Sequence, residues 1–300
     1  MTTNRAAPIL FRMACLAGLL SLAFWAYGQG ARAAKGKTTH TTTSRDGTRI
    51  TYDRQGTGPA LIVVGGALSD RSGAAGLADL LAARFTVYSY DRRGRGGSTD
   101  TLPYAVEREI EDIEALIDSA GGTANVYGKS SGASLALRAA AALGSKVVKL
   151  ALYEAPYNDT EGAASEWRVF RAKLDEHLAA GRRAEAITLF MGFVGAPDDV
   201  IAQMKASPAW PGMLAMAHTL AYDNAVVGDD WSVPVDIAAR ITAPTLVMDG
   251  GASLGPLPYM RQAADRLGQA IPAAQRLVIE GQSHDVSPEI LVPHLLKFFS

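Results

Sequence analysis

The segment formed by residues 124–144, ANVYGKSSGASLALRAAAALG, constrains the fold more than any other stretch of the chain. A short apolar run leads into a turn with two glycines, and an alanine- and leucine-rich run then ends at Gly144, which predicts a strand, a sharp turn and a helix. The GKS string is not a phosphate-binding loop, because that motif needs a glycine where Thr123 stands. The pattern G-x-S-x-G instead predicts a nucleophile, Ser130, with its hydroxyl exposed at the turn.

The same alternation of short apolar strands and helices continues through most of the chain. Predicted strands such as PALIVVGG, TVYSYD, KVVKLALYEAP, APTLVMDGG and QRLVIEG are separated by helical patterns such as AVEREIEDIEALIDSAG. Strands that alternate with helices form βαβ units, so we predict an α/β fold with a doubly wound, mostly parallel β-sheet. Only helical patterns occur in residues 157–232. We predict that they form a helical cap at the carboxyl edge of the sheet, inserted between core segments 34–156 and 233–300.

Residues 1–33 are typical of a secretory signal peptide. Arg5 and Arg12 precede the apolar run MACLAGLLSLAFWAYG, and QGARA supplies the small residues Ala31 and Ala33 for cleavage. The alternative is an uncleaved membrane anchor, because the uncharged stretch is nearly long enough to span a bilayer. Gly28 and Gly30 shorten its continuous apolar part, which favours cleavage. We therefore predict an exported protein, periplasmic or extracellular, with no stable membrane association after the signal is removed.

Charge and cysteine content argue against several classes of function. Removal of residues 1–33 takes away three arginines and no acidic residue, which changes the formal net charge from −1 to −4. A mildly acidic chain argues against nucleic-acid binding. The single cysteine, Cys15, lies within the predicted signal peptide, so the mature chain is expected to have no disulfide, no thiol chemistry and no cysteine-ligated metal. Nothing in the sequence indicates an oligomeric state.

A serine hydroxyl becomes a good nucleophile only when a base takes its proton, so a histidine must come within hydrogen-bond reach of Ser130. Four of the five histidines lie in the polar linker, the predicted insertion or the last helix: His40, His177, His218 and His294. His284 alone follows a predicted strand, in VIEGQSHDVSPE. Loops at the carboxyl ends of parallel strands converge on the turn of the nucleophile. We therefore predict His284 as the base.

Together these segments resemble the α/β-hydrolase family across nearly the whole mature chain. Besides GKSSG, the matching segments are VVGGA, DRRGRGGS, APTLVM and EGQSHDVSPE. The resemblance implies an oxyanion hole formed by two backbone N–H groups, those of Ser131 and Ala67. Asp91 and the arginines of DRRGRGGS are predicted to form a turn with solvated charges. Lys129 is predicted to contact the insertion or solvent.

The acid of the triad is where the sequence departs from the family pattern. The resemblance places an aspartate three residues after Gly250, but Ser253 stands there, and a serine does not stabilise an imidazolium as a carboxylate does. Glu154 ends the strand before the insertion, where some lipases of this fold carry their acid, and we favour it. Asp249 is the alternative acid, although its side chain can point away from the base. Asp285 is a third candidate and is predicted to be a solvated loop residue.

The sequence therefore predicts a serine hydrolase that cleaves a small ester, thioester or lactone through an acyl-enzyme, with no cofactor and no metal. A serine at the turn argues against epoxide hydrolases and haloalkane dehalogenases, which need an aspartate nucleophile. Two alternatives stay open. Ser130 and His284 could instead serve carbon–carbon bond hydrolysis or cofactor-free peroxidation. The missing acid at the usual position would also suit a non-catalytic ligand-binding protein on the same fold.

Overall fold

The computed structural model describes residues 36–254 and 257–300. The predicted signal peptide, residues 1–33, therefore lies outside the described residues. Within the described ranges, no helix is both long enough and apolar enough to cross a lipid bilayer.

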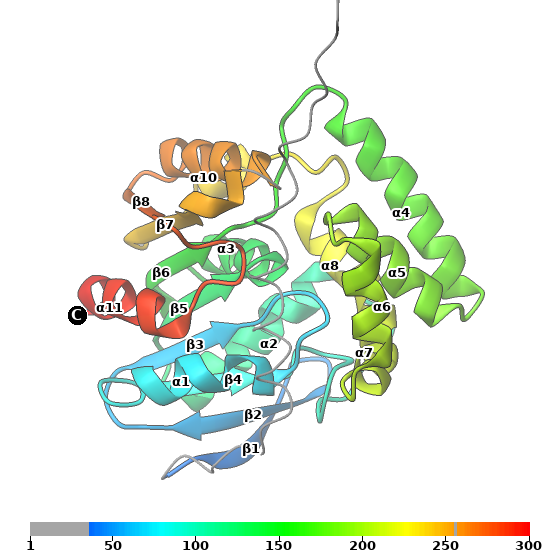
Figure 1. Ribbon diagram of the computed structural model, residues 1–300. Helices are drawn as coiled ribbons and strands as arrows, with labels where there is room; N and C mark the ends of the chain where they lie inside the picture. Colours follow the sequence, from blue (N-terminus) through cyan, green and yellow to red (C-terminus); the bar gives the residue numbers. More distant parts are fainter. Residues whose placement is uncertain (1–35, 255–256) are drawn as a thin grey trace, which may run out of the picture. The chain divides into compact units, whose positions relative to one another are not determined.

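The described chain is built around a single eight-stranded β-sheet (Figure 1). Its strands are β1 (Thr38–Thr43), β2 (Arg49–Gln55), β3 (Ala60–Val64), β4 (Thr86–Tyr90), β5 (Ala124–Lys129), β6 (Val147–Tyr153), β7 (Thr245–Gly250) and β8 (Ala274–Ile279). They lie in the order β1-β2-β4-β3-β5-β6-β7-β8. The β1–β2 and β2–β4 pairs are antiparallel, and all pairs from β4 to β8 are parallel. The predicted mostly parallel α/β sheet is confirmed, and the residues that follow its parallel strands gather at one edge.

Helices cover both faces of this sheet. The α-helices are α1 (Ala75–Leu81), α2 (Val106–Ser119), α3 (Ser131–Leu143), α4 (Ala163–Ala179), α5 (Arg183–Phe193), α6 (Asp198–Ala206), α7 (Trp210–Met216), α8 (Leu220–Val227), α9 (Val235–Ala238), α10 (Tyr259–Ala270) and α11 (Pro288–Phe299). Short 3-10 helices are η2 (Arg71–Ala74), η3 (Gly144–Lys146), η4 (Ala217–Thr219) and η5 (Gly251–Leu254).

Two apolar clusters lie on the two faces, because successive side chains of a strand point in opposite directions. In β3, Ile62 and Val64 belong to the cluster that includes residues of α2, α3 and α10. The alternate residues Leu61 and Val63 belong to the cluster that includes residues of α1 and α11. The continuous apolar runs of the sequence are thus explained by burial on both sides of the sheet.

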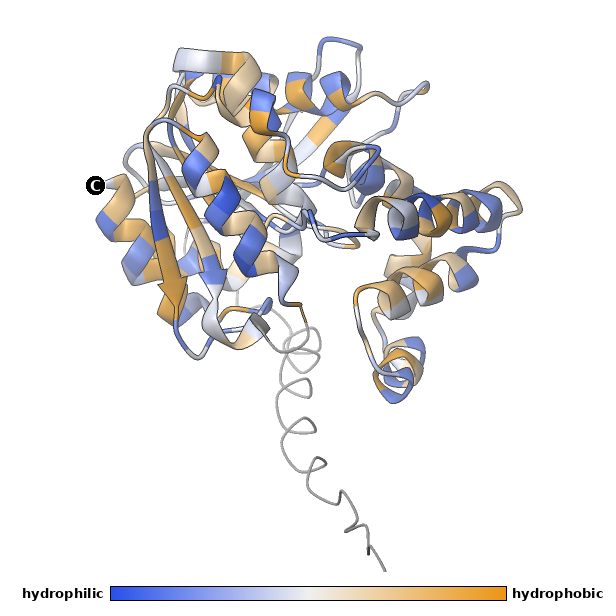
Figure 2. Cartoon of the chain, turned by 90° about the horizontal axis from the view of Figure 1, so that it is seen from above, coloured by the Kyte–Doolittle hydropathy of each residue, from blue (hydrophilic) through white to orange (hydrophobic). Residues whose placement is uncertain are grey.

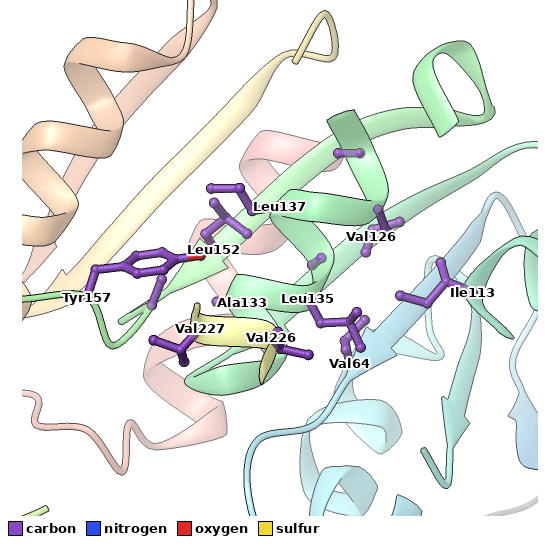
Figure 3. Packing of buried hydrophobic residues seen from close by; sticks show 14 of the residues in the cluster. Val64, Ile113, Val126, Ala133, Leu135, Leu137, Leu152, Tyr157, Val226 and Val227 are labelled. Carbon is purple, nitrogen blue, oxygen red and sulfur yellow. The ribbon is translucent and has the colours of Figure 1, made fainter. Parts of the chain in front are cut away.

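The chain between β6 and β7 contains helices α4 to α9 and no strand. Figure 2 shows that these helices carry both apolar and polar residues, as expected for helices with one face packed inward. One of them, α8, lies directly on α3: Figure 3 shows Val226 and Val227 beside Ala133 and Leu135, and all four side chains are buried in the same cluster. This contact brings α8 next to the helix that begins immediately after Ser130.

Candidate active site

Ser130 lies on a strained turn between β5 and α3. Its φ angle is 59° and its ψ angle is −133°, a conformation that an L-residue rarely adopts. The turn closes only because the flanking residues lack side chains: a Cβ on Gly128 would lie 2.4 Å from the carbonyl oxygen of Gly132, and one on Gly132 would lie 2.3 Å from that of Val64. The G-x-S-x-G pattern therefore has a steric cause, and it presents the serine at the start of a helix.

The side chains of Glu154 and His284 are paired at the same edge of the sheet. Glu154 follows β6 directly, and its Oε2 lies 2.7 Å from Nδ1 of His284. Its other oxygen, Oε1, accepts a 2.8 Å hydrogen bond from the Gly250 N–H. Burial opposes ionisation of Glu154, but hydrogen bonds and the attraction of His284 outweigh it and hold its pKa below the ordinary value. An ionised carboxylate only accepts hydrogen bonds, so Nδ1 carries the proton and Nε2 is left free to accept one.

The other carboxylates that the sequence offered lie elsewhere. Asp249 is buried and forms ion pairs with Arg261 and Arg276, so its side chain does point away from His284. Asp285 is 57% exposed in its side chain, and it forms an ion pair with Lys129 rather than with the neighbouring imidazole. The prediction that Lys129 contacts the insertion or solvent is therefore incomplete, since its ammonium lies 3.0 Å from Asp285 on the loop after β8.

Ser253, at the position where the family usually has an aspartate, lies in η5 and is 2% exposed. Its hydroxyl makes no hydrogen bond of ordinary geometry to any of the residues that the structure describes, yet it lies close enough to the Glu154 carboxylate to help lower the pKa of that group. Ser253, at the position of the family's usual acid, is thus a neighbour of the Glu154 carboxylate.

Two contacts hold the loop of His284 against the carboxyl ends of β5 and β6. The residue before the serine is joined to the residue after the histidine by the Lys129–Asp285 ion pair. In addition, the Tyr153 hydroxyl donates a 2.5 Å hydrogen bond to the carbonyl of Ser283. Among the described residues, the Ser130 hydroxyl makes no direct hydrogen bond to His284. Hydrogen bonds between catalytic groups are often long in the absence of substrate and shorten in the reacting complex.

Two backbone N–H groups adjoin Ser130. Ser131 is the first residue of α3, so its N–H has no acceptor within the helix. Ala67 follows Gly66, whose backbone lies so close that a Cβ there would be 3.0 Å from Cβ of Ser130. Within residues 36–254 and 257–300, neither the Ala67 nor the Ser131 N–H donates to another backbone carbonyl outside helices and strands. Both groups are available to a negatively charged oxygen.

The prediction that the charges of DRRGRGGS are solvated is wrong. Arg92, Arg93 and Arg95 are at most 1% exposed, and Asp91 is fully buried. Each arginine meets a carboxylate from a distant part of the chain, such as Glu109 and Asp112 of α2 or Asp223 of α8. These acids left one signal in the sequence, because each stands beside apolar residues that the helices bury: Glu109 and Asp112 lie with Ile113, Leu116 and Ile117 in α2, and Asp223 lies with Leu220 and Val226 in α8. The described residues contain no cluster of three or more His, Cys, Asp or Glu side chains arranged to hold a metal ion.

A mostly parallel sheet, a serine on a strained strand-to-helix turn and a histidine after the last strand together define a protein of the α/β-hydrolase type. The model of the alpha/beta hydrolase family matches residues 60–293, and the chain belongs to this family.

Solved structures agree with that assignment. An alpha/beta hydrolase from Sphaerobacter thermophilus is 50% identical, with a TM-score of 0.79, over 87% of this chain and 100% of that chain. An esterase from a Rhodococcus species is 22% identical, with a TM-score of 0.64, over 87% of this chain and 98% of that one. An enol-lactonase from Burkholderia xenovorans is 21% identical, with a TM-score of 0.63, over 87% and 99%. The latter two likenesses show the fold alone.

Proposed function

We propose that this protein is a serine hydrolase that cleaves a small ester, thioester or lactone through an acyl-enzyme on Ser130. The observation that carries the proposal is the pairing of the buried Glu154 carboxylate with the half-buried His284 imidazole, beside the strained turn of Ser130. The ionised carboxylate holds the proton on Nδ1 and would stabilise the imidazolium that forms when Nε2 takes a proton from the serine. The alternative of a non-catalytic binding protein was based on Ser253, which stands where the family usually has its acid. The Glu154–His284 pair weakens that alternative, because it offers His284 a carboxylate from another position.

In the proposed mechanism, Ser130 Oγ attacks the substrate carbonyl carbon while its proton passes to Nε2 of His284. The carbonyl oxygen becomes an oxyanion and accepts hydrogen bonds from the N–H groups of Ser131 and Ala67. The tetrahedral intermediate then collapses, and His284 returns the proton to the departing alcohol, thiol or ring oxygen. Water attacks the resulting ester with His284 again as base, which releases the acid and restores the serine.

The test is intact-mass analysis of the mature protein after treatment with an organophosphonate serine probe, beside Ser130→Ala. The control is Ser134→Ala, because Ser134 is a buried serine one helical turn further along α3. We expect one phosphonyl adduct per chain in the wild type and in Ser134→Ala, and none in Ser130→Ala. Hydrolysis of p-nitrophenyl acetate should follow the same order. Absence of an adduct on the folded wild type would overturn the proposal.

A further inference from the structure

A buried carboxylate from α8 reaches the first residue of α3. Asp223 is 3% exposed, and its Oδ1 accepts a 2.8 Å hydrogen bond from the Ser131 hydroxyl. The same carboxylate pairs with Arg92 at 2.6 Å, and both its oxygens lie 2.9 Å from Nη2 of Arg95. Asp223 thus holds the side chain of Ser131, and the backbone N–H of Ser131 adjoins Ser130.

The other terminal nitrogen of Arg95, Nη1, reaches the loop that carries Gly66 and Ala67. Nη1 of Arg95 donates to the carbonyl of Gly66 at 2.6 Å and to that of Ser69 at 3.3 Å, and the Ser69 hydroxyl also donates to Gly66 at 2.8 Å. In a trans peptide the C=O and the next N–H point in opposite directions. Donors that hold the Gly66 carbonyl therefore also set the direction of the Ala67 N–H.

We propose that Arg95 and Asp223 are positioning residues that orient the two N–H donors of the oxyanion hole together. Asp223 anchors Ser131 through its hydroxyl, and Arg95 connects Asp223 to the Gly66–Ala67 peptide. This inference rests on the proposed function, because an oxyanion forms only if Ser130 attacks a carbonyl. It gives the helical segment between β6 and β7 a part in the chemistry through one carboxylate, in addition to its packing on α3.

The charges within this cluster are balanced. Arg92 forms a two-point ion pair with Glu109, with both nitrogen–oxygen distances at 2.7 Å, while Asp223 faces both arginines. Two guanidinium groups thus meet two carboxylates away from water. Burying ion pairs costs desolvation energy, and apolar residues of similar volume often stabilise a fold equally well. A buried network at this place is therefore more readily explained by the alignment it imposes on Ser131 and Ala67 than by stability.

The experiment compares Arg95→Lys with Arg93→Lys. Both arginines lie in the same loop and are at most 1% exposed, but Arg93 pairs with Asp46 and Asp112 and contacts neither donor peptide. A lysine keeps the charge and loses the planar fork that spans Asp223 and Gly66 at once. Since loss of a whole oxyanion donor lowers kcat by about a hundred- to a thousandfold, misalignment in Arg95→Lys should lower kcat for p-nitrophenyl acetate by about ten- to a hundredfold. KM should change by less than about threefold, as expected when only transition-state interactions are lost.

Inhibition by a trifluoromethyl ketone with a butyl chain separates positioning of the oxyanion hole from a merely structural role, which would leave the inhibition constant unchanged. The ketone forms a tetrahedral adduct with the serine and places an oxyanion in the hole. Its inhibition constant should rise in Arg95→Lys by the same factor by which kcat/KM falls, because both report transition-state binding. In Arg93→Lys, kcat and the inhibition constant should stay within about threefold of wild type, even where the melting temperature falls similarly.

Ser131→Ala is the second variant and serves if Arg95→Lys fails to fold. It keeps the backbone N–H and removes only the hydroxyl held by Asp223, so a fall in kcat of about three- to tenfold with unchanged KM supports orientation of the N–H group. Equal kinetics in Ser131→Ala and wild type, or equal losses in Arg95→Lys and Arg93→Lys, would overturn the positioning role and leave the proposed function standing. A wild type that takes no phosphonyl adduct on Ser130 would overturn both.

Discussion

Replacement of Glu154 by glutamine is the sharpest test of how the site works. The substitution keeps the size of the side chain, and its amide oxygen can still accept the hydrogen bond from Gly250. It removes the negative charge that lies against Nδ1 of His284 at 2.7 Å. A glutamine can also donate its NH₂ to Nδ1, which would move the ring proton to Nε2 and block its role as a base.

The magnitude follows from the charge pair. In the proposed mechanism, the transition state places a positive imidazolium beside Glu154, whose side chain is fully buried. Two unit charges about 4 Å apart attract by about 4 kcal/mol at an effective dielectric constant of about 20. Since each ~1.36 kcal/mol is a factor of ten in rate, Glu154→Gln should lower kcat by about a thousandfold. KM should change little, because the imidazolium is absent from the ground state.

The assay is steady-state hydrolysis of p-nitrophenyl acetate at neutral pH, with Asp249→Asn as the matched control. Asp249 is an equally buried carboxylate at the end of the neighbouring strand β7, but it pairs with two arginines. Its replacement should lower the melting temperature and leave kcat within about threefold of wild type. A loss below tenfold in Glu154→Gln, or a thousandfold loss in Asp249→Asn, would refute the assignment of the charge that stabilises His284.

Three further results are expected. Since interactions with His284 keep the pKa of Glu154 below its usual 4.5 despite burial, this carboxylate should stay ionised as the pH falls toward 4.5, and its protonation should not steepen the acid limb of log(kcat/KM) beyond a slope of one. A slope of two above pH 4.5 would contradict this. Gly132→Ala should lower the free energy of unfolding by about 2 kcal/mol or more, because the new Cβ would lie 2.3 Å from a carbonyl oxygen. The control is Gly192→Ala, which has open space around it and should leave the free energy of unfolding unchanged or raise it by up to about 1 kcal/mol. Thermal or urea unfolding measures both. If the predicted signal peptide is cleaved, N-terminal sequencing of the chain purified from the expressing cells should begin after residue 33, and a full-length chain in the membrane fraction would favour the anchor instead.

The parts of the site that the sequence predicted are those set by local pattern. The turn of Ser130 is fixed by two glycines within two residues of it, and its strand and helix are contiguous with it in the chain. His284 could be selected because it alone follows a strand. Glu154 needed one further step, since the prediction depended on its place at a strand end and on the resemblance to certain lipases. The structure places the Glu154 carboxylate 2.7 Å from Nδ1 of His284.

The buried arginines could not be predicted, because their burial depends on partners far away in the chain. A string of arginines and glycines ordinarily indicates an exposed loop, since charged side chains are rarely buried without partners. The partner of Arg95 is Asp223, which lies 128 residues further along the chain on α8. Nothing in the sequence of the arginine loop indicates that this helix packs against it. Asp223 itself stands in LAYDNAVV, where one acid interrupts an apolar run. Such an isolated acid, paired with an excess of arginines elsewhere, is the signal that sequence reasoning could have used.

The neighbouring positions of Ser253 and Glu154 are consistent with the proposal that the acid comes from the end of β6 instead of from the loop after β7. Strands β6 and β7 are adjacent and parallel, so their carboxyl ends lie side by side at the same edge. Glu154 has a φ of 48°, which turns the chain sharply at the end of β6, and its long side chain reaches both Gly250 N–H and His284. In the proposed mechanism the base requires only that a negative charge lie at Nδ1 of His284, and the Glu154 carboxylate, 2.7 Å away, meets that requirement from the end of β6.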